Sequence, residues 1–434
     1  MAAGLIALIA VTASTAWAVT PKTKRVTLKS NGDEVNADAD NPATSGNGRF
    51  VAFESVGKFT GGDAGTDADV FVTDRRTGKT KRMSVKSNGK EVNSGDGSED
   101  SAMSADGRFI AFTSDAALTN GDTNGMLDVF VHDRKTGRTT RVSVTSSEQQ
   151  VLADSEHPAI SANGRFVAFD SDGQFSGGDG NGMVDVYERD RKTGKTKRIS
   201  VDSSGQGVLA DSDSPAVSAD GRFVAFESDG QLTPQTDYGP FPLLDSDIFL
   251  RDTKTRKTTR MSLKSNGDEV STSAQVPSRD PAISADGRFV TFRTGGAFVP
   301  GDANGLEDVY VHNRQTGKTQ LVSVTSNGTS GNAPSGIAAP APLSANGRFI
   351  AFESNADLVG SDGNAYRDVY LRDRKAGKTK RISVKSNGGA VDANHQEPAI
   401  SGDGRFVAFA SLGAFTGGDS GNDFDVFMRG PLFR

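Results

Sequence analysis

The sequence contains no cysteine, and its only tryptophan is Trp17. Without cysteine the chain forms neither disulfide bonds nor thiolate metal sites, which leaves packing, with or without ions bound by other side chains, to stabilise the fold. Long helical patterns are absent, and Gly-x-Ser-x-Gly, the motif of α/β-hydrolase nucleophiles, does not occur. Glycine, in contrast, accounts for 51 of the 434 residues, and hydrophobic residues for 35%. This balance is typical of short strands joined by tight turns.

The N-terminal segment has the composition of a secretory signal. Residues 2–18 carry no charge and end at Ala16-Trp17-Ala18, which fits the small-x-small rule of signal cleavage. We therefore expect residues 1–18 to be a signal peptide and the mature chain to be secreted, periplasmic or in the cell envelope, with no transmembrane span after cleavage. The segment departs from the usual signal pattern in one respect, because no Lys or Arg precedes the apolar stretch. The alternative is a buried first strand or a membrane anchor.

One sequence block occurs seven times, at intervals of 57 to 66 residues. Each copy contains Gly-Arg-Phe, with the arginines at Arg49, Arg108, Arg165, Arg222, Arg288, Arg348 and Arg405. We expect four strands per copy, named a to d from the innermost outward. Examples are b at 108–114, c at 128–132 and d at 139–144, followed by a of the next copy at 158–161. The repeat predicts an all-β fold, a closed seven-bladed β-propeller of four-stranded antiparallel blades over residues 19–434.

The strand patterns also predict how the ring closes. Strand b is apolar at successive positions, as in 109–112, which indicates burial on both faces between neighbouring blades. Strand d alternates, as in 197–201, which indicates an outer edge with one side in water. The seventh copy stops after strand c at 425–429, while residues 22–28 read as an unattached strand d. We expect these two segments to pair, completing the last blade and removing an exposed edge.

The repeat resembles that of a known family. Ser-Ala-Asp-Gly-Arg-Phe-Val-Ala-Phe followed by Asp-Val-Phe-Val-x-Asp-Arg is similar to the WD40-like propeller repeat of TolB-type proteins, and the resemblance covers nearly the whole mature chain. It implies a propeller and a protein-binding role in the cell envelope. TolB also has an N-terminal α/β domain, which this sequence lacks, so the resemblance extends to the propeller only. Peptidases with TolB-like repeats carry an α/β-hydrolase domain after the propeller, which is also lacking here.

Charge is distributed unevenly between the two faces of the expected ring. The b–c loops and d–a links must lie on one face, and they are rich in aspartate; the a–b and c–d turns on the opposite face are rich in Lys and Arg. We call the first the acidic face and the second the basic rim. We expect a protein or an envelope polymer to bind the acidic face, and we expect a monomer that does not bind nucleic acid.

Four b–c loops share an Asp-x-Asn pattern that ends in a further Asp at strand c. The four sets are Asp122, Asn124 and Asp128; Asp179, Asn181 and Asp185; Asp302, Asn304 and Asp308; and Asp362, Asn364 and Asp368. Carboxylate and amide oxygens on a tight turn suit Ca²⁺, which takes 6–8 oxygen ligands, so weak structural Ca²⁺ is one interpretation. The other is that these side chains only cap their own turns. No other cofactor is expected.

The b–c loop of the fourth copy departs from the repeat. This loop, residues 233–245, is longer than the corresponding loops of the other copies. We expect it to bring four apolar or aromatic side chains to the acidic face: Tyr238, Phe241, Leu243 and Leu244. Exposed apolar side chains in an insertion indicate a ligand-binding surface. The alternative is that the loop folds back and covers the central channel.

Histidines are few, and their placement argues against a catalytic cluster. His157 and His395 precede strand a in the third and seventh blades, where they are candidate ligand-binding residues at the channel mouth. His132 and His312 end strand c and are expected to be exposed. We therefore expect no catalytic residues and a non-enzymatic binding scaffold. The alternative is a propeller enzyme, a polysaccharide lyase or a hydrolase of lactonase type, with its site at the channel mouth.

Overall fold

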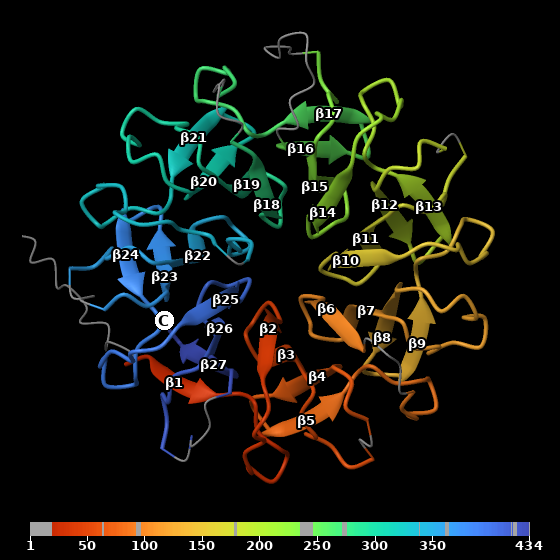
Figure 1. The fold of residues 1–434 in the computed structure, drawn as a ribbon, viewed down its shortest axis with the longest axis horizontal. Helices are drawn as coiled ribbons and strands as arrows, with labels where there is room; N and C mark the ends of the chain where they lie inside the picture. The colour runs from red at the N-terminus through yellow and green to blue at the C-terminus, as the bar shows by residue number, and fades with distance from the viewer. Residues whose placement is uncertain are drawn as a thin grey trace, which may run out of the picture.

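The computed structural model describes residues 20–62, 65–92, 97–177, 180–234, 246–270, 276–337, 339–360, 364–417, 419 and 423–433. Seven antiparallel sheets surround a central channel, and Figure 1 shows the chain running once around the ring. All 27 elements are strands, and no helix long and apolar enough to cross a membrane occurs in the described part of the chain. The predicted seven-bladed β-propeller is confirmed.

The first four blades each have four strands, and the innermost comes first in the chain. Blade 1 is β2 (Ala39–Thr44), β3 (Phe50–Ser55), β4 (Asp69–Asp74) and β5 (Lys79–Arg82); blade 2 is β6 (Ser98–Met103), β7 (Phe109–Ser114), β8 (Asp128–Asp133) and β9 (Arg138–Arg141). Blade 3 is β10 (Ser155–Ile160), β11 (Phe166–Ser171), β12 (Asp185–Asp190) and β13 (Lys195–Arg198); blade 4 is β14 (Ser212–Val217), β15 (Phe223–Ser228), β16 (Asp247–Asp252) and β17 (Lys257–Arg260).

The remaining blades complete the ring. Blade 5 is β18 (Ser278–Ile283), β19 (Phe289–Thr294), β20 (Asp308–Asn313) and β21 (Lys318–Leu321); blade 6 is β22 (Phe349–Ser354), β23 (Asp368–Asp373) and β24 (Lys378–Arg381). Blade 7 is β25 (His395–Ile400), β26 (Val407–Ser411), β27 (Asp425–Gly430) and β1 (Lys22–Arg25), so its outermost strand comes from the N-terminal end of the described chain.

Ring closure follows the prediction. β1 pairs antiparallel with β27, with Lys22 opposite Gly430 and Arg25 opposite Phe427. The pairing continues beyond the strand, where the Val26 N–H donates to the Val426 carbonyl at 2.8 Å. The outer edge of β27 is therefore covered, as the other third strands are covered by their own fourth strands.

Blade 6 differs from the predicted four-stranded pattern. Its innermost position is occupied by residues that make isolated bridges, Ser335 with Ser354 and Leu343 with Ile350, and not by a continuous strand. This segment contains Pro340 and Pro342, and because proline has no N–H it cannot donate to a ladder.

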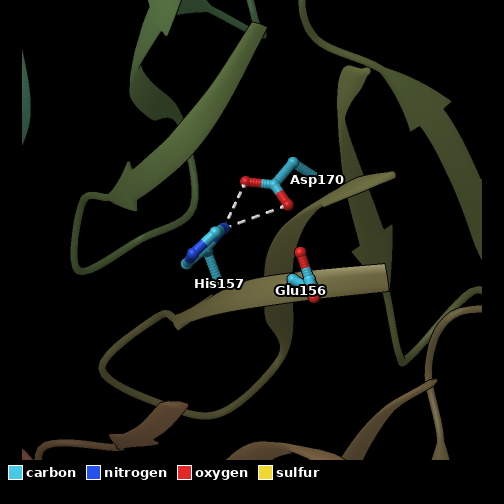
Figure 2. Close-up of side chains that lie close together, drawn as sticks. All are labelled: Glu156, His157 and Asp170. Atoms are coloured by element: carbon cyan, nitrogen blue, oxygen red, sulfur yellow. Dashed lines mark hydrogen bonds and ion pairs between the residues drawn. The ribbon is translucent and has the colours of Figure 1, made fainter. Parts of the chain in front are cut away.

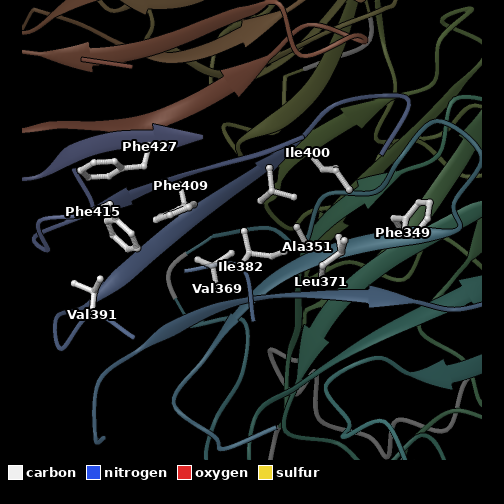
Figure 3. Packing of buried hydrophobic residues seen from close by; sticks show 11 residues of the cluster. Phe349, Ala351, Val369, Leu371, Ile382, Val391, Ile400, Phe409, Phe415 and Phe427 are labelled. Carbon is white, nitrogen blue, oxygen red and sulfur yellow. The ribbon is translucent and has the colours of Figure 1, made fainter. Parts of the chain in front are cut away.

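The core lies between neighbouring blades. Figure 3 shows one cluster, in which Phe409 of blade 7 lies among residues that include Val369 and Leu371 of blade 6. The neighbouring Ala408 belongs to a different cluster, together with Phe53 of blade 1. Alternate residues of β26 thus pack against different blades, which confirms the prediction that strand b is buried on both faces.

The repeated Gly-Arg-Phe motif fastens the blades together on the basic rim. Arg108 donates two hydrogen bonds to Asp133, at 2.8 and 2.7 Å, and Arg134 lies 4.0 Å from the ring centroid of Phe50 in the preceding blade. Gly107 has φ of 71°, and a Cβ there would lie 2.3 Å from the Phe50 ring, so this position requires glycine. Many arginines of the basic rim therefore form contacts within and between blades that stabilise the ring.

Candidate functional site

The channel mouth on the acidic face is lined by one residue from the start of each innermost strand. These residues, which we call the mouth ring, are Asn41, Asp100, His157, Ser214, Asp280 and Glu397, all with φ between 44° and 55°. The left-handed conformation coincides with a shift of register in the pairing of each innermost strand with its neighbour. All six line a central cavity of about 610 Å³. A repeated backbone irregularity thus forms a ring of polar side chains.

Carboxylates from the second strands brace this ring across the blade boundaries. Glu54 of blade 1 accepts the backbone N–H of Ser101 in blade 2 at 2.8 Å, and Asp170 of blade 3 accepts that of Ser214 in blade 4 at 2.9 Å. The same contact to the next blade is made by Glu227 and Glu353. We call these four side chains the bracing carboxylates. They were not predicted, although each directly follows a Phe-x-x-Phe segment of strand b.

The mouth carries a surplus of buried carboxyl groups. Burial is the largest cause that raises the pKa of Glu54 to about 8 and those of Glu227 and Glu397 to about 7, and nearby carboxylates add to it. Burial likewise raises the pKa of Asp213 to about 6. These groups resist ionisation because too little positive charge lies near them.

His157 is the one histidine of the mouth ring, and Figure 2 shows its imidazole directed at Asp170, with Glu156 beside them. Nδ1 of His157 lies 2.9 and 3.2 Å from the two carboxylate oxygens of Asp170. The Asp170 hydrogen bond is the largest cause that raises the pKa of His157 to about 10, with further help from Asp100 and Glu156. The ring is therefore a cation at neutral pH, and the predicted place of His157 at the channel mouth is where the structure puts it.

His395 was also predicted at the channel mouth, and the structure corrects this. Its side chain is fully buried, its Nδ1 lies 2.7 Å from the Ser411 hydroxyl, and its ring packs against Phe415. His395 is the first residue of β25, just as Ser155 is the first residue of β10. In both strands the mouth-ring residue comes two positions later. Glu397, not His395, is the blade 7 equivalent of His157.

The other two histidines are buried and not exposed as predicted. His132 is 5% and His312 4% exposed, and Nδ1 of each lies 2.9 Å from the hydroxyl of a threonine on strand d, Thr139 and Thr319 respectively. Burial lowers the pKa of both to about 4, so each is a neutral structural side chain at neutral pH.

Arginines from the fourth strands form ion pairs with aspartates of the predicted calcium loops. Nη1 of Arg141 lies 3.3 Å from Asp122 and 2.8 Å from Asp128, and the Arg141 side chain is only 7% exposed. Asp185 pairs with Arg198 and Asp368 with Arg381 in the same way. In these loops a guanidinium supplies positive charge beside the aspartates. The prediction that strand d is an outer edge with one side in water did not identify this set of arginines on its other side.

The Oδ1 atoms of Asn124, Asn181 and Asn364 each accept the backbone N–H two residues further on, as turn capping requires. Nδ2 of Asn124 donates to the Val151 carbonyl and Nδ2 of Asn181 to the Val208 carbonyl, both at 2.8 Å, while Asn364 donates to Asp392 at 3.1 Å. These bonds tie each b–c loop to the d–a link that follows strand d of the same blade.

Blade 5 is the exception among the loops with this pattern. Leu321 stands where the other fourth strands have arginine. Asn304 donates to Asp308 at 2.9 Å, and Asp302 accepts a hydrogen bond from the Tyr310 hydroxyl. Burial raises the pKa of Asp308 to about 6.

Several predicted residues lie outside the described ranges. They are the signal segment 1–18, Asp179 and Asp362 of the Asp-x-Asn loops, and Tyr238, Phe241, Leu243 and Leu244 of the blade 4 loop.

Comparison with known proteins supports the fold. The β-propeller domain of the trilobed protease from Pyrococcus furiosus matches with a TM-score of 0.54 and 12% identity, over 92% of this chain and 98% of that one. A chain from a study of two prolyl endopeptidases matches with a TM-score of 0.52 and 10% identity, over 89% of this chain but 47% of that one. The shared feature is the propeller.

TolB from Acinetobacter baumannii is also among the similar structures, with a TM-score of 0.39 and 15% identity over 92% of this chain and 80% of that one. No protein-family model and no curated protein sequence matches the chain. At these identities the likeness concerns the fold, and the function has to be argued from the site.

Proposed function

We propose that the protein is a non-enzymatic, exported binding propeller that takes a positively charged segment of a partner protein at the channel mouth. The observation that carries this proposal is the surplus of carboxyl groups around the mouth ring, several of them with raised pKa values. A lysine or arginine side chain placed among them would favour their ionised form and gain from an attraction that water screens only weakly there.

The charge around the mouth also suggests where such a segment would lie. Arg293 pairs with Asp280 and Glu307 in blade 5, and Arg367 lies 3.5 Å from Glu353 of blade 6. The arc from blade 7 through blade 1 to blade 4 includes Asp40, Glu54, Asp100, Asp213 and Glu397, all carboxyl groups with raised pKa values. This arc is the preferred contact for the partner's cations.

Fluorescence anisotropy with labelled oligolysine and oligoglutamate peptides tests the proposal. We expect oligolysine to bind and its affinity to fall about tenfold or more when the salt concentration is raised from about 50 to about 300 mM. Asp213→Asn and Glu397→Gln should each weaken binding. Asp33→Asn, which removes an exposed carboxylate from an outer turn, is the matched control and should not. Equal binding of oligoglutamate, or equal effects of all three substitutions, would contradict the proposal.

The blade 4 loop supplies the second part of the proposed surface. From the sequence, we expect Tyr238, Phe241 and Leu244 to provide apolar contact area on the acidic face. Replacing all three by Ser should weaken capture of the native envelope partner without lowering the melting temperature. Unchanged capture would remove the loop from the binding surface.

Export has its own test. When the full chain is expressed with its N-terminal segment, we expect the mature protein to begin near Val19 because Ala16-Trp17-Ala18 fits the cleavage rule. Intact-mass measurement of the extracytoplasmic fraction gives the answer, and an uncleaved N-terminus would contradict the signal peptide.

An enzyme of lyase or hydrolase type is the second candidate, and the observation that favours it is the His157–Asp170 pair at the mouth. A protonated imidazole held by a carboxylate can act as a general acid. A screen of polysaccharide and lactone substrates, with and without divalent metal, would favour the enzyme if turnover appeared and His157→Asn abolished it.

A further inference from the structure

Three side chains with metal-binding atoms meet at one point of the channel wall in blade 3. Glu156 and His157 are neighbours on β10, and Asp170 comes from β11. Each offers one ligand atom, and these atoms all lie within 4.8 Å of one another (Figure 2). We infer that this is a site for one divalent transition-metal ion such as Zn²⁺, held by Glu156, His157 and Asp170. The inference is independent of the proposed peptide binding.

The distances in the cluster suit such an ion after a small movement. Zinc takes histidine nitrogen and carboxylate oxygen at about 2.0–2.2 Å, so two ligands at a tetrahedral angle lie about 3.4 Å apart. In the structure Nδ1 of His157 is 2.9 and 3.2 Å from the oxygens of Asp170. An opening of a few tenths of an ångström, with release to solvent of the proton that Nδ1 carries in the cationic ring, would therefore admit the ion between them. The side chain of His157 is 50% exposed and that of Asp170 4%, so one ligand is held rigidly and the other faces the channel.

Blade 3 is distinguished from the other blades by its mixture of ligand types. The corresponding residues are Asp40, Asn41 and Glu54 in blade 1, Asp213, Ser214 and Glu227 in blade 4, and Gln396, Glu397 and Ala410 in blade 7. Those sets offer oxygen or amide groups, whereas blade 3 offers an imidazole with two carboxylates. Imidazole favours zinc and its first-row neighbours, while Ca²⁺ prefers oxygen ligands alone.

The surroundings of the cluster distinguish it from the second place where potential ligands converge. Glu34, Asp419 and Asp425 also lie together, but Arg25 is 3.0 Å from Glu34 and 2.8 Å from Asp425, so a guanidinium already meets their charge. Around the blade 3 cluster the interacting charged neighbours are further carboxyl groups, Asp100 and Asp213. A divalent cation would be attracted by this whole group.

A buried hydroxyl next to the cluster is a separate sign that a polar ligand belongs there. Thr113 occupies in blade 2 the strand position of the bracing carboxylate Glu54, which reaches the mouth residues of the next blade. Its side chain is fully buried, and its hydroxyl has no hydrogen-bond partner among the described atoms. By the same geometry this hydroxyl is directed toward the mouth of blade 3, where a water bound to the ion would satisfy it.

Isothermal titration of the metal-stripped, full-length protein with Zn²⁺ alone tests the inference. We expect one ion per chain, and we expect His157→Asn to weaken binding about tenfold or more. Asn41 adopts the same left-handed conformation at the equivalent position of blade 1, so asparagine should be accepted there without loss of the fold. Glu156→Gln should also weaken binding. Asp40→Asn, the blade 1 counterpart of Glu156→Gln, is the matched control and should leave the affinity for Zn²⁺ unchanged.

Co²⁺ serves as a spectroscopic probe of the same site. Its visible absorption in the wild type should report nitrogen and oxygen ligands, and the bands should change or disappear in His157→Asn. Zn²⁺ binding that is unaltered by His157→Asn, or lowered equally by Asp40→Asn and Glu156→Gln, would overturn the inference, because either result would mean attraction by the acidic face in general. Absence of Zn²⁺ binding to the folded wild type would overturn it as well.

Discussion

At the scale of one residue, Glu54 shows how a buried carboxyl group at the mouth lowers the stability of the fold when it ionises. It is 4% exposed and accepts hydrogen bonds from the Ser101 backbone and from Nδ2 of Asn41 at 3.0 Å, yet burial raises its pKa to about 8. In the unfolded chain the same carboxyl has its ordinary pKa of 4.5. The folded state thus binds more protons between these two pH values, and the free energy of unfolding falls as the pH rises from one to the other.

Glu54→Gln should remove this pH-dependent cost. We expect the variant to be more stable than the wild type at about pH 9, by an amount on the order of 2 kcal/mol, and to differ little from it at about pH 4. Thermal unfolding across this pH range measures the difference. The exposed Asp33→Asn is the control, and a stability difference for Glu54→Gln that does not change with pH would contradict the assignment.

At the scale of an element, one position of strand d determines whether the aspartates of the neighbouring b–c loop have a cationic partner. Arg141 of β9 contacts Asp122 and Asp128, whereas blade 5 has Leu321 at the same place. Arg141→Leu would leave two buried carboxylates without their cation, so we expect a loss of about 3 kcal/mol in the free energy of unfolding. Arg138→Leu, an exposed arginine on the same strand, should cost far less.

The same variant tests calcium in the loops. With Arg141 removed, Asp122 and Asp128 face a space where a cation would replace the guanidinium. We therefore expect millimolar Ca²⁺ to raise the melting temperature of Arg141→Leu more than that of the wild type. Equal shifts in both proteins would mean that these aspartates do not bind Ca²⁺ even when their arginine is absent.

At this scale the sequence predicts some features well and others poorly, for identifiable reasons. The strands and their order follow from a repeat whose apolar pattern is forced by burial between blades. The channel residues were harder to predict, although in five of the six blades a proline directly follows the mouth residue and marks its position. His157 directly precedes Pro158, whereas His395 is three residues before Pro398. The bracing carboxylates Glu54 and Asp170 were missed because an acid at the end of an apolar strand resembles a loop residue until the neighbouring blade is in place.

At the scale of the whole molecule, the ring depends on a pairing between residues about 400 positions apart in the chain. Because the chain has no cysteine of its own, the closure can be tested by a single introduced pair, Lys24→Cys with Met428→Cys, which are opposite one another in the β1–β27 register. Oxidation should give a cross-linked monomer whose melting temperature exceeds that of its reduced form, since the bond prevents β1 from leaving β27 and exposing an edge.

A second pair supplies the comparison for this closure test. Lys24→Cys with Lys197→Cys joins β1 to β13 of blade 3, which lies in a different sheet and has no contact with it in Figure 1. We expect this pair to form no bond within one molecule. If instead both pairs oxidised equally well, or if neither did, β1 would not be held where the structure places it. The outer edge of β27 would then be uncovered, and the ring would lack the pairing that closes it.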